Sequence, residues 1–190
     1  MKGRTEFAEA ALEIAIPYAK ERIQFKTPLA EKQGYSHKLI IPHVVRLAAA
    51  DAFISEVAAR LDSGEEDLEV EGSIAKLFAT ESANSAAESA MQALGGYGYI
   101  AEYGVEKIKR DVRITCIYEG TSEIQQTIIS TFRWKTTRKS KGGFYQAISE
   151  VIGPNEALDA IIAAEKDHLF KLMKVVTAGA KFRGLQDDWP

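Results

Sequence analysis

The sequence predicts an all-α protein, built as an up-down four-helix bundle with a C-terminal helical extension. Apolar residues recur every three or four positions along several long stretches, which is the period of one helix face. Short connections that contain glycine or proline separate these stretches. Such connections place consecutive helices side by side in opposite directions, as in an up-down bundle.

The first two bundle helices are expected over residues 5–24 and 36–61. Pro17 lies inside the first helix and should bend it unless packing absorbs it. Residues 25–34 contain a proline and a glycine, so we expect a connection there. Asp51 interrupts the apolar stripe of the second helix.

The third bundle helix is expected over residues 65–94. Its acidic start suits the helix dipole, and its many alanines allow a neighbouring helix to approach closely. Three glycines within residues 95–98 cannot continue this helix. They indicate positive φ angles, a ligand close to the main chain, or both. A short helix over residues 105–112 and the last bundle helix over residues 122–138 follow.

A domain boundary is expected in the basic stretch of residues 135–143, which contains a glycine pair. The bundle would then occupy residues 1–134 and the extension residues 135–190. Two amphipathic helices are expected in the extension, over residues 144–152 and from Pro154 onward.

Composition limits the classes of function. The 190 residues carry a net charge of -3, which gives no electrostatic reason to expect nucleic acid. The histidines are scattered, so no metal site is expected. The single cysteine, Cys116, is interpreted as a packing residue and fits a reducing, cytoplasmic compartment. No apolar run is long enough to span a membrane.

The most informative stretch runs from Ile117 to Gln125, because it places a carboxylate before a glycine and a possible helix cap. Glu119 would lie at a loop–helix junction, beside main-chain N–H groups that have no helical partner. This arrangement can direct a general base at a substrate whose carbonyl needs hydrogen-bond donors. The same stretch is also consistent with an ordinary capped helix start, with Thr121 as the N-cap.

Three further stretches accompany this motif in a fixed order. They are Arg22-Ile23-Gln24-Phe25 with Gln33, then Gln92-Ala93-Leu94-Gly95-Gly96-Tyr97-Gly98-Tyr99, then the segment from Glu102-Tyr103 to Arg110-Asp111. Together, the motifs resemble those of the acyl-CoA dehydrogenase family, and the resemblance covers roughly residues 11–129. In that family, the matching region is the C-terminal helical bundle, which agrees with the fold that the helical pattern predicts.

The resemblance implies oxidation of a saturated acyl-CoA thioester to the trans-2-enoyl thioester. Glu119 matches the glutamate that removes the α proton while FAD accepts the β hydride. Its own N–H would be one donor to the thioester oxygen. Gly120 would give the acyl chain room, and Tyr118 would form a wall of the substrate site.

The resemblance also implies the residues that bind FAD. Arg22, Gln24, Phe25 and Gln33 match residues that bind the ADP half. Gln92, Gly95 and Gly96 match a loop that receives the ADP moiety across a dimer interface, and Thr121 and Glu123 match positions near the cofactor. The implied partners are an acyl-CoA substrate, further copies in a homodimer or homotetramer, and an acceptor resembling electron-transfer flavoprotein.

Three departures from the family pattern stand out. Lys26 replaces a usual glycine, so the turn after Phe25 is expected to differ. Arg133 is displaced from the position near Thr131 where the family often has a CoA-binding arginine. The family's N-terminal helical and middle β-barrel domains have no counterpart in this chain, so we expect it to be inactive alone. The missing half could be a separate chain; alternatively, the bundle is a non-catalytic assembly module.

Overall fold

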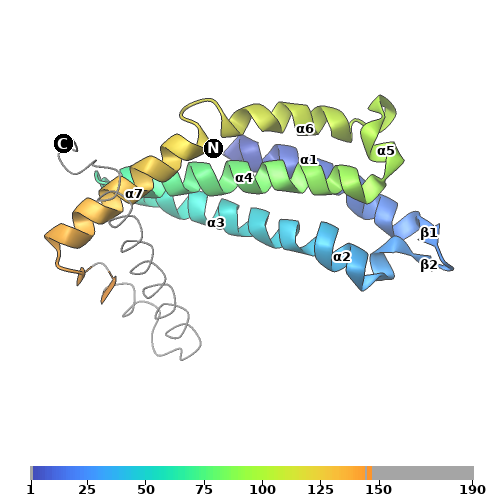
Figure 1. Ribbon diagram of the computed structural model, residues 1–190, viewed down its shortest axis with the longest axis horizontal. Coiled ribbons are helices and arrows are strands. Elements are labelled where there is room, and N and C mark those ends of the chain that lie inside the picture. Colours follow the sequence, from blue (N-terminus) through green and yellow to red (C-terminus); the bar gives the residue numbers. More distant parts are fainter. Residues whose placement is uncertain (1, 144, 147–190) are drawn as a thin grey trace, which may run out of the picture. The chain divides into compact units, whose positions relative to one another are not determined.

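The computed structural model describes residues 2–143 and 145–146, and it confirms the all-α fold class (Figure 1). The chain divides into two units, Met1–Trp134 and Lys135–Pro190. Apart from residues 145 and 146, the helices expected in the extension lie outside the described residues.

The described part consists of helices and one small hairpin. In chain order the main elements are α1 (Lys2–Glu21), β1 (Ile23–Gln24), β2 (Thr27–Pro28), α2 (Gln33–Leu39), α3 (Ile41–Asp62), α4 (Glu69–Leu94), α5 (Gly96–Tyr99), α6 (Val105–Arg113) and α7 (Ser122–Lys139). Short 3₁₀ turns occupy Leu29–Glu31, Ala101–Tyr103 and Ile114–Cys116.

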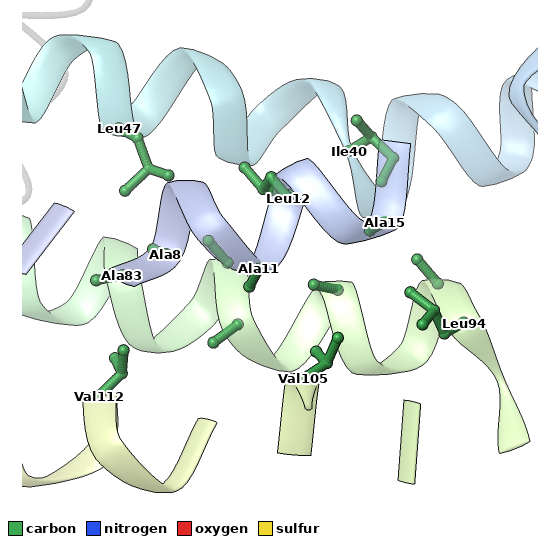
Figure 2. Close-up of a cluster of buried hydrophobic side chains, with 14 residues drawn as sticks. Ala8, Ala11, Leu12, Ala15, Ile40, Leu47, Ala83, Leu94, Val105 and Val112 are labelled. Atoms are coloured by element: carbon green, nitrogen blue, oxygen red, sulfur yellow. The ribbon is translucent and has the colours of Figure 1, made fainter. Parts of the chain in front are cut away.

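Helix α4 lies at the centre of the first unit, with α1, α3 and α6 packed around it (Figure 1). Alanines fill the contact between α1 and α4, and Ala8, Ala11 and Ala83 are fully buried (Figure 2). Their small side chains let the two backbones approach closely. Leu47 closes the core from α3 and Val112 closes it from α6, so one apolar cluster joins all four helices.

The fourth helix in this cluster is α6, whereas the sequence pointed to residues 122–138. Val105 and Val112 of α6 are fully buried. In α7, only Ser122 and Gln125 are buried among the described side chains, and Ile124 is 51% exposed. The sequence showed the apolar spacing of α7, but it did not show that α7 would contribute little to the buried cluster.

The second predicted helix is divided at Ile40 into α2 and α3. Pro42 explains the division, because its ring carries no N–H and would clash with the carbonyl four residues earlier. At the start of α3 the same proline is favourable. Pro17, by contrast, is accommodated inside α1. The third helix begins at Glu69, later than expected.

Two connections are more ordered than the sequence suggested. Residues 23–28 form an antiparallel hairpin in which Ile23 pairs with Pro28 and Gln24 with Thr27. After Gly95, whose φ of 61° ends α4, the glycine-rich stretch forms the single helical turn α5. Among the described residues, no helix is both long enough and apolar enough to cross a membrane.

Candidate functional site

Glu119 lies in a tight loop between the 3₁₀ turn Ile114–Cys116 and α7. Its φ of 55° is in the left-handed region, which is unusual for a residue with a side chain. Gly120 follows with a φ of 89°, and an added Cβ would lie 2.7 Å from Gln125 Nε2. The positive φ therefore favours glycine at this position, and a Cβ there would also displace the Gln125 amide.

Gln125 reaches back from α7 to stabilise this loop. Its side chain is 7% exposed, and its Nε2 atom donates to the Glu119 carbonyl oxygen at 3.1 Å. Nε2 also lies 3.4 Å from the Gly120 carbonyl oxygen. The turn that carries Glu119 is thus held by the first turn of the helix that follows it.

The capping role falls to Thr121 and Glu123, and Glu119 lies outside it. Thr121 precedes α7, and its hydroxyl oxygen accepts from the Ile124 N–H at 3.4 Å. The pKa of Glu123 is lowered mainly by a hydrogen bond from the main-chain N–H of Glu123 itself, and next by one from the Thr121 hydroxyl. Glu119 precedes the helix and is exposed. The two interpretations of the motif, helix cap and positioned carboxylate, therefore apply to different residues.

The surroundings of Glu119 are apolar but open. Ile114 is 53% exposed, Ile117 45% and Tyr118 40%. Exposed large apolar side chains that cluster in this way mark a surface that another molecule or domain covers. The described residues of this chain do not themselves enclose the carboxylate, so the dry environment expected for a strong base would need a further covering surface.

Residues on α4 contact the same loop, and sequence reasoning missed them. Lys76 is 5% exposed and donates from Nζ to the Gly120 carbonyl oxygen at 2.7 Å. Glu81 accepts a hydrogen bond from the Ser122 hydroxyl. One sequence signal was present: Lys76 is a lone lysine between alanines that occupy the buried face of α4.

A second cluster of predicted residues lies at the other end of α4. The end of α1 and the end of α4 form an open cleft of about 550 Å³. The cleft brings together five residues that the resemblance assigns to the ADP half of FAD. They are Arg22, Gln24, Gln92, Gly95 and Gly96.

The polar groups of this cleft fit a diphosphate. Gln24 accepts from Arg22 Nη2 at 2.9 Å and Nε at 3.2 Å, in the amide orientation that satisfies both side chains. The planar guanidinium of Arg22, exposed at the end of α1, can bind two phosphate oxygens at once. At Gly95 and Gly96 the space above the main chain is open, so a ligand can approach the backbone.

Two of the residues that the resemblance assigns to the ADP half are outside the cleft. Phe25 is 91% exposed, and its ring lies 5.8 Å from Lys32 Nζ. Gln33 is exposed at the start of α2. The hairpin turn has positive φ at both central residues, 49° at Phe25 and 71° at Lys26, as a type I′ turn requires. The turn thus remains tight even though Lys26 stands where the family usually has glycine.

Tyrosines support the glycine-rich side of the cleft, which the sequence analysis did not identify. Tyr97 stacks on Tyr103 at a centroid distance of 4.9 Å and meets the edge of Tyr18 at 6.1 Å. The Tyr35 hydroxyl donates to the Ala93 carbonyl oxygen at 2.8 Å. These contacts attach α5 to α1 and to the turn before α6, and the end of α4 to α2.

The predicted site residues therefore occupy two separate places. From Lys76, beside the Glu119 loop, to Gln92, at the cleft, α4 rises about 24 Å. Tyr118, Glu119, Gly120, Thr121 and Glu123 lie at the first place. Among the described residues, no group of histidine, cysteine and carboxylate side chains could hold a metal ion.

Comparison with known proteins identifies the family. The family model for the acyl-CoA dehydrogenase C-terminal domain matches residues 3–132. The chain belongs to the acyl-CoA dehydrogenase family. Its first unit corresponds to the C-terminal domain of that family, and both the Glu119 loop and the cleft lie within the matched region.

Individual relatives show how much of their length this chain spans. It is 46% identical over 125 residues to an acyl-CoA dehydrogenase of Bacillus subtilis, covering 66% of this chain and 32% of the relative. It is 42% identical to the caffeyl-CoA reductase-Etf complex subunit CarC of Acetobacterium woodii, covering 65% of this chain and 32% of that subunit. The chain thus spans about a third of the length of these relatives.

A solved structure gives the same picture. The structure of PigA in complex with FAD superimposes with a TM-score of 0.62 at 27% identity, covering 71% of this chain and 33% of PigA.

Proposed function

We propose that this chain supplies the catalytic base and one part of the cofactor site of an FAD-dependent acyl-CoA dehydrogenase. The observation that carries the proposal is the geometry of Glu119. Its carboxylate precedes α7 on a left-handed turn that Gln125 stabilises, and the exposed apolar residues Ile117 and Tyr118 come directly before it in the chain. An ordinary capping acid needs none of these features.

In the proposed reaction, the Glu119 carboxylate breaks the Cα–H bond of the acyl-CoA thioester and takes the proton. The Glu119 N–H donates to the thioester oxygen, which gains negative charge as the proton leaves. Tyr118 and Ile117 exclude water on one side, and desolvation of this kind strengthens a carboxylate base. FAD supplies the acceptor for the hydride that leaves the β carbon.

The two-place arrangement favours a site shared between copies of the chain. The ADP cleft of one copy would serve the Glu119 loop of another in a homodimer or homotetramer, because about 24 Å of α4 separates them within one copy. The flavin ring and part of the acyl pocket would be bound by the portion of the enzyme that the relatives have in addition, within this polypeptide or as a separate chain. A cytoplasmic location and an acceptor resembling electron-transfer flavoprotein complete the proposal, since one relative is a subunit of an Etf complex.

The decisive experiment replaces the base in the enzyme assembled with its flavin-binding portion. Glu119→Gln keeps the shape of the side chain and removes its basicity. Reduction of an artificial electron acceptor by acyl-CoA should fall at least about 10²-fold, because positioned acid–base catalysis is worth about 10²–10⁴-fold. FAD absorbance of the purified enzyme should be unchanged, since the ADP cleft is untouched.

Glu69→Gln is the matched control, because Glu69 is an exposed acid in the first turn of α4. It should change stability by at most about 1 kcal/mol through the helix dipole and leave turnover intact. Near-normal turnover of the Glu119→Gln enzyme would contradict the proposed base. An assembled enzyme without any turnover would favour the non-catalytic assembly module.

A further inference from the structure

Lys76 and Glu81 of α4 bind the loop that carries Glu119 and the first residue of the helix that follows it. Lys76 Nζ donates to the Gly120 carbonyl oxygen at 2.7 Å, and the Glu81 carboxylate accepts from the Ser122 hydroxyl. We propose that Lys76 and Glu81 are positioning residues that hold Glu119 in its reactive orientation. The inference rests on the proposed function, because the carboxylate that they position is the proposed base.

The burial of Lys76 is the first argument. Its residue exposure is 5%, and lysine is among the residues least often buried unless it is paired. Hydrogen bonds that involve a charged donor are shorter and roughly twice as strong as neutral ones. A buried ammonium group aimed at a main-chain carbonyl, 44 residues away in sequence, is a costly arrangement with a specific target.

Helix stability does not explain this cation. Gly120 lies two residues before Ser122, the first residue of α7. The N-terminal end of a helix carries a partial positive charge, so a cation placed there is unfavourable for the helix itself. The Gly120 carbonyl accepts the charge-assisted bond, and the Lys76 charge also helps to lower the pKa of Glu123 in the first turn of α7.

The left-handed turn at Glu119 is what needs holding. For a residue with a side chain, this conformation costs about 1–2 kcal/mol and persists only where the surroundings enforce it. The Glu119 carbonyl is bonded to Gln125 of α7, and the Gly120 carbonyl to Lys76 of α4. Two consecutive peptide planes are thereby held from two elements, and the main chain from which the Glu119 side chain projects is restrained.

A third contact attaches the other side of the loop to α4. The Cys116 thiol donates to the Thr80 carbonyl oxygen at 3.4 Å. Helix α4 therefore meets the loop both before and after Glu119. Because a misplacement of about 1 Å can cost about 10²-fold in rate, such anchoring matters for a group that must meet one carbon–hydrogen bond.

The first test is hydrogen exchange in the full chain with Lys76→Met. The amides of Ile117 and Tyr118 donate to the Ile114 carbonyl oxygen and report on the loop. Loss of a charged hydrogen bond should speed their exchange about tenfold or more. The rise in loop exchange should exceed what any change in the midpoint of urea unfolding accounts for.

Lys109→Met is the matched control. Lys109 of α6 also donates to an α4 main-chain carbonyl, that of Asn84 at 3.1 Å, but it does not contact the loop. Its replacement should leave the exchange of Ile117 and Tyr118 unchanged. Two results would overturn the positioning role. The exchange rates of Ile117 and Tyr118 could be unchanged in Lys76→Met, or they could rise only as much as a lower midpoint of urea unfolding explains.

The second test measures turnover in the assembled enzyme. Lys76→Met should lower kcat about tenfold with little change in KM or FAD content, and Lys76→Arg, which keeps a cationic donor, should recover part of the loss. If the unsubstituted enzyme shows no dehydrogenation, the proposed function fails and the exchange result alone decides the positioning role. If the enzyme is active and Lys76→Met matches it in both kcat and loop exchange, the positioning role fails and the proposed function stands.

Discussion

His43 is the most unusual buried residue outside the two places described above. It is 7% exposed, and its Nε2 atom lies 2.7 Å from the Ser89 hydroxyl oxygen. Its Nδ1 atom has no hydrogen-bond partner among the described residues. Burial, followed by repulsion from the Arg46 guanidinium, lowers the pKa of His43 below its ordinary value. The fold therefore favours the neutral form of the imidazole between α3 and α4.

Acid should destabilise the fold through this residue. The unfolded chain binds the proton first, at a pKa of about 6.5, because the folded-state pKa is lower. Stability should thus be full above about pH 6.5 and decline as the pH falls toward the folded-state pKa, by at most about 1.4 kcal/mol per pH unit for one proton. In His43→Gln this part of the decline should disappear.

Urea unfolding at a series of pH values between about 5 and 8 measures the effect. His37→Gln is the control, because His37 is exposed on α2 and should leave the pH dependence unchanged. A His43→Gln variant whose stability declines with acid as steeply as that of the unsubstituted chain would exclude His43 as the source.

At the scale of elements, α5 depends on one glycine. Gly98 is buried, and an added Cβ would lie 2.2 Å from the Met91 carbonyl oxygen and 2.8 Å from the Met91 Cα atom. Both are main-chain atoms of α4, so they cannot move aside as the end of a flexible side chain could. The close approach of α5 to α4, which shapes the rim of the cleft, therefore requires glycine at this position.

Gly98→Ala should lower the free energy of unfolding by about 1–3 kcal/mol, the usual cost of overpacking. Gly34→Ala is the control. Gly34 lies in α2 with open space above it, so alanine there should stabilise the helix by about 0.5–1 kcal/mol. Urea unfolding of both variants measures the contrast. Equal stability of Gly98→Ala and the unsubstituted chain would show that α5 can leave α4 without loss.

Long helices were predictable from the sequence because their periodic apolar residues repeat over many turns. The hairpin at residues 23–28 was not, since each strand has two residues and no alternation to detect. The division at Ile40 was missed although Pro42 provides its cause. The role of α6 as the fourth helix depends on which apolar faces meet, and spacing along one helix carries no information about its partner.

In the candidate site, too, local sequence patterns were predictable and contacts between distant residues were not. The residues of the local motifs, such as Glu119 and Arg22, could be proposed as site residues because each motif is contiguous. Lys76 could not, since its contact with Gly120 joins residues 44 apart in the sequence. The motifs also did not indicate that the predicted cofactor residues form two groups, one beside Lys76 and the other beside Gln92 of α4.

At the scale of the whole molecule, the outer face of α3 remains uncovered by the described part of the chain. Val45 is 61% exposed, Ile41 44% and Val44 42%, and Ala48 and Ala49 beside them are also exposed. An apolar helix face of this kind is typical of an interface with another molecule. Since the proposed function needs two copies to complete one site, we expect the chain to self-associate through this face.

Val45→Lys should weaken self-association about tenfold or more, because burying a valine is worth about 1.5–3 kcal/mol and the lysine charge adds a desolvation cost. Sedimentation equilibrium on the order of tens of micromolar measures it. Leu61→Lys is the matched control, since Leu61 has the same exposed fraction of 61% but lies at the far end of α3. A strict monomer for the unsubstituted chain would contradict the shared site, because the cleft proposed to bind ADP and the Glu119 loop of one copy are about 24 Å apart along α4.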